Sequence, residues 1–144
     1  MKPNELIEKL DEAQIVVAIA AAERTTSAEL RVCVSHRRRK DALAAAQARF
    51  RKLGMERTRH RNGVLIFFVP HTQQFAVWGD SGVHARCGEE FWKGMVADMT
   101  SLLKAGRFTD AIVFAVTNVG EVLARHFPTE PGDRNELSNR VARD

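Results

Sequence analysis

The chain has 144 residues, of which 44% are hydrophobic and 28% are charged, and its formal net charge is +4. This length matches one ordinary globular domain, which can bury a core without disulfide or metal staples. Its two cysteines, Cys33 and Cys87, are too few to indicate the disulfide framework of a small secreted protein.

The N-terminal segment lacks the pattern of a secretory signal. Residues 1–11 mix acidic residues with lysines, and no apolar core follows a basic start. The longest uncharged apolar stretch nearby, residues 15–22, is far shorter than the roughly 20 residues that a membrane span requires. We therefore expect a soluble, cytoplasmic monomer without a transmembrane segment.

The first part of the chain predicts a helix, a strand and a second helix. Asn4 can cap a helix that runs to about Arg24, because apolar residues recur there at helical spacing. Residues 28–35 alternate apolar and polar side chains, which is typical of a strand. A second helix is expected between Asp41 and Gly54. Its inner face is expected to carry Leu43, Ala46, Phe50 and Leu53.

Two paired strands are predicted next. Residues 63–69 form a continuous apolar run, which is typical of a central strand covered on both faces. Residues 70–73 resemble a turn, and residues 74–78 form a third strand that ends at Gly79-Asp80-Ser81-Gly82. Because the connection is so short, the second and third strands should form an antiparallel hairpin.

Two amphipathic helices follow, separated by Gly106. Their apolar positions are Trp92, Met95, Val96, Met99, Leu102 and Leu103, then Ile112, Ala115, Val116, Val119, Val122, Leu123 and His126. The strand–helix–strand portion predicts a right-handed parallel crossover. The fold class is therefore α/β, a three-layer α/β/α sandwich with a small mixed central sheet. We expect one domain over residues 1–127 and a polar C-terminal tail over residues 128–144.

Polar residues at three strand ends are predicted to meet at one edge of the sheet. Glu29 begins the first strand, Asn62 precedes the second, and Asp80 follows the third, which runs in the opposite direction. Ser81 adds a hydroxyl group. Carboxylate, amide and backbone oxygens suit a hard divalent cation such as Ca²⁺ or Mg²⁺. The sequence therefore predicts a divalent-cation site at this edge.

Several residues around Asp80 admit more than one interpretation. Gly79 and Gly82 flank the turn and His84 follows it, so the loop and the next helix can also hold a phosphate. Asp80 can equally cap a turn or a helix. Glu29 can be an ordinary exposed strand residue, and Asn62 can belong to a tight turn.

Two basic clusters carry much of the positive charge, residues 36–40 and the set Arg57, Arg59, His60 and Arg61. Such clusters either bind phosphate, nucleic acid or anionic lipid, or form solvated loops. No helix-turn-helix, zinc-finger or RNP pattern occurs, so no sequence-specific nucleic-acid partner is expected. Paired histidine spacing, a Gly-x-Ser-x-Gly elbow, a Walker loop and a dinucleotide fingerprint are also missing, so no catalytic residue is assigned.

Several segments together match the pattern of one known family. Residues 26–32 and 61–66 resemble its first two strands, residues 75–84 resemble its third strand and loop, and Phe91-Trp92 opens the next helix. Residues 126–137 resemble the tail of a soluble bacterial branch, so the resemblance extends from about residue 10 to 139. The family is the TPM domain, named after a thylakoid-lumen phosphatase, a photosystem II repair protein and a modulator of nematode acetylcholine receptors.

The resemblance implies an α/β/α sandwich, divalent-metal binding that is calcium in some relatives, and a proposed acid phosphatase activity. The positions that match the family motif are Glu29, Asn62, Gly79, Asp80 and Ser81. Many relatives carry a signal peptide and a membrane anchor, neither of which is expected here, and the basic run at residues 36–40 stands where relatives are often acidic.

Three functions are compatible with these features. The preferred one is a divalent-metal-binding interaction or assembly domain that acts with membrane or envelope protein complexes. The alternative is a metal-assisted phosphatase that hydrolyses phosphomonoesters, with Arg31 or the basic loop holding the phosphate. Anion or nucleic-acid binding through the basic loops ranks third.

Overall fold

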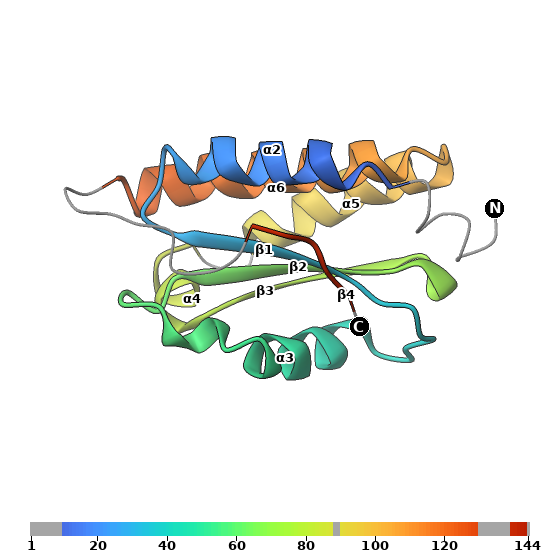
Figure 1. Cartoon of the computed structure of the whole chain (residues 1–144), viewed down its shortest axis with the longest axis horizontal. Helices are drawn as coiled ribbons and strands as arrows, with labels where there is room; N and C mark the ends of the chain where they lie inside the picture. The colour runs from blue at the N-terminus through green and yellow to red at the C-terminus, as the bar shows by residue number, and fades with distance from the viewer. Residues whose placement is uncertain (1–9, 88–89, 130–138, 144) are drawn as a thin grey trace.

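The computed structural model describes residues 10–87, 90–129 and 139–143 (Figure 1). Its mixed sheet has the strand order β3-β2-β1-β4. The pair β1–β2 is parallel, β1–β4 is parallel, and β2–β3 is antiparallel, as the short connection between β2 and β3 predicts. The strands are β1 (Glu29–Val34), β2 (Gly63–Val69), β3 (Gln74–Gly79) and β4 (Ala142–Arg143).

Helices cover both faces of this sheet. Helices α2, α5 and α6 lie over one face, and α3 lies over the other (Figure 1). The short α4 follows β3 at the end of the sheet where β1 and β2 begin. The α-helices are α2 (Glu12–Glu23), α3 (Ala42–Lys52), α4 (Ser81–Cys87), α5 (Glu90–Lys104) and α6 (Phe108–His126). The predicted three-layer α/β/α sandwich is therefore confirmed.

The central strand β2 explains why the sandwich has two cores. All seven of its residues are buried. Val64, Ile66 and Phe68 pack into the core under α2, α5 and α6, whereas Leu65, Phe67 and Val69 pack into the core above α3. A continuous apolar run is thus required, because successive side chains of a strand point to opposite faces.

The predicted helices differ from the structure at two places. The first helix begins at Glu12 rather than near Asn4, which lies outside the described residues, because Asp11 caps it by accepting a hydrogen bond from the backbone N–H of Gln14. In α3, Asp41 is the N-cap as predicted, but Leu43 is 45% exposed, and Ala42 is buried in its place beside Ala46 and Phe50.

Two short elements escape the sequence analysis. The turn expected at residues 79–82 gives way to α4, which already begins at Ser81. Ala142–Arg143 form β4, which pairs with Cys33 and Val34 of β1. Part of the C-terminal segment therefore belongs to the sheet.

The paired helices α5 and α6 bury the expected apolar faces. Met95, Met99 and Leu103 of α5 are buried, as are Ile112, Ala115, Val116, Val119 and Leu123 of α6. The side chains of Trp92 and Val96 lie outside the described set. Among the helices that the structure describes, none has both the length and the apolar character needed to cross a bilayer.

Candidate functional site

The backbones of Glu29, Asn62 and Asp80 meet at the edge of the sheet where β1 and β2 begin and β3 ends, called here the Asp80 edge. Glu29 is the register partner of Gly63, and its N–H donates to the carbonyl of Asn62 at 3.4 Å. The N–H of Asp80 donates to the carbonyl of the same Gly63 at 2.9 Å. The strand directions thus bring three distant chain segments within hydrogen-bond contact.

Asp80 is buried and already has a cationic partner. Its two carboxylate oxygens accept hydrogen bonds from Nε and Nη2 of Arg61 at 2.8 and 2.9 Å, the bidentate geometry that guanidinium and carboxylate groups favour. The N–H of Ser81 also donates to Oδ1 at 2.7 Å. The hydrogen bond from Arg61 to Asp80, together with the charge of that carboxylate, raises the pKa of the guanidinium.

The backbone of Asp80 also begins α4. Its carbonyl accepts hydrogen bonds from the N–H groups of Val83 and His84 at 2.9 and 3.1 Å. The interpretation of Asp80 as a helix cap therefore describes its backbone, whereas its side chain holds Arg61. Arg61 itself has a positive φ of 51°, an uncommon conformation for a residue with a side chain.

The two glycines of this loop permit close packing. A Cβ atom on Gly82 would lie 2.7 Å from the carbonyl oxygens of both His60 and Arg61, and a Cβ atom on Gly79 would lie 2.8 Å from the Val83 side chain. The N–H of Gly82 donates to the Arg61 carbonyl at 3.0 Å. Gly82 therefore lets α4 rest directly on the loop that carries Arg61.

Asn62 is almost fully buried, with 1% of its surface exposed. Its backbone N–H donates to the hydroxyl of Thr58, and its side-chain Nδ2 has no hydrogen-bond partner among the described residues. Because an unsatisfied buried amide is costly, such a group calls for a partner or an explanation.

The remaining predicted residues lie apart from the carboxylate of Asp80 or make other contacts. Ser81 is exposed, and within the described part of the chain no hydrogen bond joins its hydroxyl to a base. The ring of His84 packs against Trp78, with 4.8 Å between centroids. Arg31 lies within β1, two residues beyond Glu29, and its buried Nε has no hydrogen-bond partner among the described residues.

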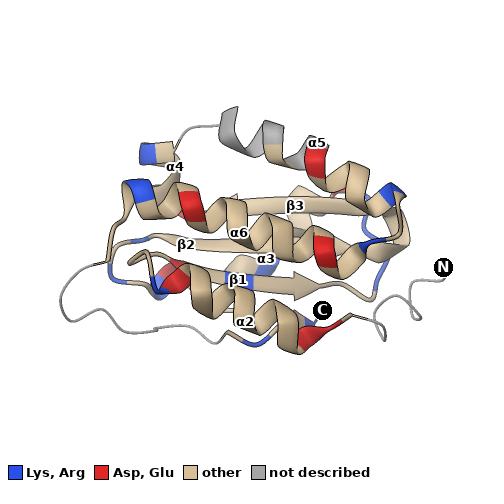
Figure 2. Cartoon of the chain, turned by 90° about the horizontal axis from the view of Figure 1, so that it is seen from above, with Lys and Arg blue, Asp and Glu red and all other residues tan. Residues whose placement is uncertain are grey.

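Glu29 has a neighbour that sequence reasoning missed. Glu23, the last residue of α2, accepts a hydrogen bond at Oε2 from the N–H of Leu30 at 3.2 Å. Burial first, then the hydrogen bond and the negative charge of Glu29, raises the pKa of Glu23 from 4.5 to about 9. Burial and the neighbouring Glu29 therefore favour the protonated form of Glu23. In Figure 2 the C-terminal end of α2, coloured red, lies beside the start of β1.

These contacts decide how well the edge suits a divalent cation. In the described ranges, no group of three or more His, Cys, Asp or Glu side chains is arranged to hold a metal ion. The carboxylate of Asp80 has suitable oxygen donors, but Arg61 occupies them. The Arg61 side chain is 53% exposed and the Asp80 side chain only 6%, so the guanidinium can turn into solvent while the carboxylate stays. A cation at this edge would have to displace Arg61 from the oxygens of Asp80.

Comparisons with known proteins identify relatives of this fold. The family model of the TPM domain matches residues 1–122. The NMR structure of the BA42 protein from the psychrophilic bacterium Bizionia argentinensis is similar, with a TM-score of 0.85, 32% identity and coverage of 92% of each chain.

A second solved structure, the N-terminal domain of a protein from P. gingivalis, has a TM-score of 0.67 and 17% identity, and the match covers 82% of this chain and 78% of that one. At that identity the likeness shows a common fold. No curated protein matches the chain. The family match and the similarity to BA42 agree with the geometry of the sheet and its edge, and the chain belongs to the TPM domain family.

Proposed function

We propose that this TPM domain is a non-enzymatic interaction domain that binds Ca²⁺ or Mg²⁺ at the Asp80 edge. The observation that carries this proposal is the asymmetry of the Arg61–Asp80 pair, in which a buried carboxylate is neutralised by a half-exposed guanidinium. A divalent cation and Arg61 therefore compete for the same oxygens. Asp80 and Asn62 would hold the cation, with Ser81 and Glu29 as further oxygen donors.

Competition for Asp80 gives the cation a way to change the surface. When bound, the cation supplies the positive charge that Asp80 otherwise receives from Arg61. Arg61 is then released from its bidentate pair, and its planar donors become available to a carboxylate on a protein partner. The proposed partner is a membrane or envelope protein complex.

The proposal of a non-enzymatic role is supported by the surroundings of Ser81. Within the described residues, its hydroxyl makes no hydrogen bond to a histidine or a carboxylate, which a serine nucleophile requires for activation. One observation favours the alternative, metal-assisted hydrolysis of phosphomonoesters: the half-exposed Arg61 stands beside the proposed cation ligand, where it can hold phosphoryl oxygens.

Cation binding can be tested by titrating the ¹⁵N-labelled full chain with Ca²⁺ and with Mg²⁺ and following the amide shifts of residues 79–82. We expect binding that Asp80→Asn abolishes and that Arg61→Ala strengthens by about fivefold or more, because the competing guanidinium is gone. The exposed pair Arg107–Asp110, also 2.8 Å apart, provides the matched control. Asp110→Asn should leave the affinity unchanged. Equal affinity in Asp80→Asn and wild type would end the proposal.

A second experiment distinguishes the interaction domain from the phosphatase. Immobilised chain, with Ca²⁺ or with a chelator, should retain a protein complex from membrane fractions only with the cation, and Asp80→Asn should retain none. Hydrolysis of p-nitrophenyl phosphate that depends on the cation and is lost in Asp80→Asn would instead favour the phosphatase. Equal hydrolysis by mutant and wild type would exclude that alternative.

A further inference from the structure

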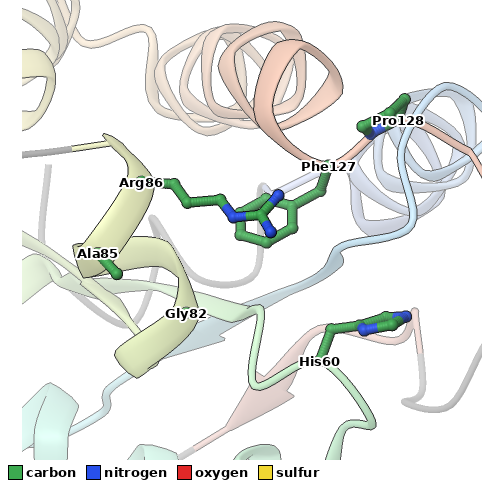
Figure 3. Close-up of a pocket in the computed structure, with 6 residues that line it drawn as sticks. All are labelled: His60, Gly82, Ala85, Arg86, Phe127 and Pro128. Carbon is green, nitrogen blue, oxygen red and sulfur yellow. The ribbon is translucent and has the colours of Figure 1, made fainter.

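A small pocket opens beside the Asp80 edge, between α4, the loop before β2 and the end of α6 (Figure 3). Its volume is about 190 Å³. The described residues that line it are His60, Gly82, Ala85, Arg86, Phe127 and Pro128. Asp80, Glu29 and Asn62 are not among them, so the pocket is distinct from the proposed cation site.

Arg86 is held in place on one side of this pocket. Its Nη1 donates to the carbonyl of His126 at 2.8 Å, and its Cζ lies 4.9 Å from the centroid of the Phe127 ring. Phe127 is buried, with 6% of its surface exposed, so the ring is a fixed support for the guanidinium. In Figure 3 the guanidinium extends from α4 over this ring.

Most of the hydrogen-bonding capacity of Arg86 is unused by the described residues. A guanidinium has five N–H donors, and the carbonyl of His126 takes one. A cation that is fixed in position and still has donors is prepared for a planar or tetrahedral oxyanion, because little side-chain entropy is lost on binding.

His60, on the loop before β2, is a second basic residue of the lining, and in Figure 3 its ring extends away from Arg86. Nε of Arg59 donates to Nε2 of His60 at 3.2 Å. Since arginine stays protonated, Nε2 is the acceptor, and a neutral ring carries its own hydrogen on Nδ1. Arg59 therefore places a permanent positive charge next to His60.

The charge of the lining favours an anion. Of the described lining residues, Arg86 and His60 are basic and none is acidic. Asp80, the buried carboxylate of the neighbouring edge, is bound by Arg61. The remaining walls are apolar, formed by Ala85, Phe127 and Pro128. An oxyanion in such a site replaces the water around a fixed cation without displacing a carboxylate.

The size of the pocket limits the ligand. Its volume of about 190 Å³ equals about six water molecules, at about 30 Å³ each. Sites for drug-sized molecules are larger, roughly 300–1,000 Å³. A phosphate group, with five heavy atoms, fits this space, whereas a whole nucleotide does not.

We propose that the pocket binds a phosphoryl head group, with Arg86 as the main anchor and the Arg59–His60 pair as the second positive group. The ligand is either free phosphate or a phosphoryl group attached to a small apolar body that packs against Phe127 and Pro128. This site does not depend on a cation at Asp80.

The test titrates the ¹⁵N-labelled full chain with inorganic phosphate and with phenylphosphonate, in the presence of a chelator. We expect saturable shifts at residues 82–86 and 126–127, and tighter binding of phenylphosphonate if an apolar body contributes. Arg86→Gln should weaken binding by about tenfold, because it removes the fixed charge and the fork of donors. Arg86→Lys keeps the charge but not the fork of donors, so its affinity should lie between those of wild type and Arg86→Gln.

A matched control lies in the last turn of α6, two residues before Phe127 of the pocket. Arg125→Gln removes the same charge from the exposed end of α6 and should change the affinity by less than about twofold. His60→Gln provides a second pocket variant if Arg86→Gln unfolds. Equal weakening by Arg86→Gln and Arg125→Gln, or shifts spread evenly over the basic residues 36–40, would show non-specific screening and overturn the proposal.

Discussion

Two buried carboxylates lie at the same end of the sheet, and the fold accommodates them in opposite ways. Asp80 is 5% exposed and is paired with the guanidinium of Arg61. Glu29 is 3% exposed and has a second carboxyl group, Glu23, as its neighbour. Around Asp80 the guanidinium of Arg61 neutralises the buried carboxylate. Around Glu29 the pKa of the neighbouring Glu23 is raised instead, which favours its protonated form.

The two regions should therefore respond to different changes in their surroundings. In the proposed cation site, a divalent cation would have to replace the half-exposed Arg61 at Asp80, so this region would respond to the cation concentration. A protonated acid beside a carboxylate responds to pH instead, because raising the pH removes the shared proton. The two regions are separate in their chemistry although they are adjacent in the sheet.

The largest change in the free energy of unfolding should come from Glu23→Gln, which removes the ionisable group whose pKa is raised. In the wild type Glu23 has a pKa of about 9 when folded and 4.5 as a free side chain. The folded state therefore binds one more proton between these values, and its stability falls as the pH rises, by at most about 1.4 kcal/mol per pH unit. Below pH 4.5 this contribution is complete.

Glutamine at position 23 can still accept from the N–H of Leu30 and donate to Glu29, but it cannot ionise. We expect Glu23→Gln and wild type to have similar stability near pH 5. At pH 8 the mutant should be more stable by about 2–4 kcal/mol. This is less than about 1.4 kcal/mol for each pH unit would give, because Glu23 is partly exposed and solvent weakens the effect. Urea unfolding at pH 5, 7 and 9 measures this. Parallel curves would contradict a raised Glu23 pKa.

A smaller effect is expected from Gly82→Ala, which disturbs the region around Asp80. The added methyl group would meet the carbonyls of His60 and Arg61 at 2.7 Å, so α4 must move away from the loop that carries Arg61. We expect a loss of about 1–3 kcal/mol in unfolding free energy, as overpacking usually costs.

The neighbouring exposed Ser81→Ala serves as the control for this substitution and should change stability by no more than about 0.5 kcal/mol. The pH dependence that Glu23 causes should be the same in Gly82→Ala and wild type. A changed pH slope would mean that the two regions are coupled after all.

The sequence predicts the meeting of Glu29, Asn62 and Asp80 because strand direction follows from local signals. The apolar run of β2 and the short connection to β3 fix an antiparallel pair, and one helix between β1 and β2 fixes a parallel one. The short strand β4 carries no such signal, since its two residues show no alternation and depend on the exposed edge of β1.

The charge partners could not be predicted in the same way. Arg61 stands in a basic cluster, and its contact with Asp80 depends on a backbone with positive φ and on the close approach that Gly82 allows. Glu23 reaches Glu29 across a loop because β4 pairs only with Cys33 and Val34, which leaves the N–H of Leu30 for a side chain. Both contacts arise from tertiary packing rather than from spacing along the chain.

The smallest change in stability should come from Glu29→Gln, which tests how much of the raised pKa of Glu23 is due to burial and how much to the charge of Glu29. Burial is the largest cause of the raised pKa of Glu23, and the hydrogen bond and charge of Glu29 add to it. Glutamine at position 29 removes the charge, so the pKa of Glu23 should fall below 9 and remain above 4.5, and the pH slope of stability should end at a lower pH than in the wild type.

Carbon-detected NMR titration of the Glu23 carboxyl group measures this value directly, and wild type provides the reference. A pKa that stays at about 9 in Glu29→Gln would mean that the two carboxyl groups are not coupled. A pKa that returns to 4.5 would mean that the charge of Glu29, rather than burial, keeps Glu23 protonated. An intermediate pKa would mean that burial alone still favours the protonated form of Glu23. That result would support the contrast with Asp80, whose buried carboxylate has a guanidinium as its partner.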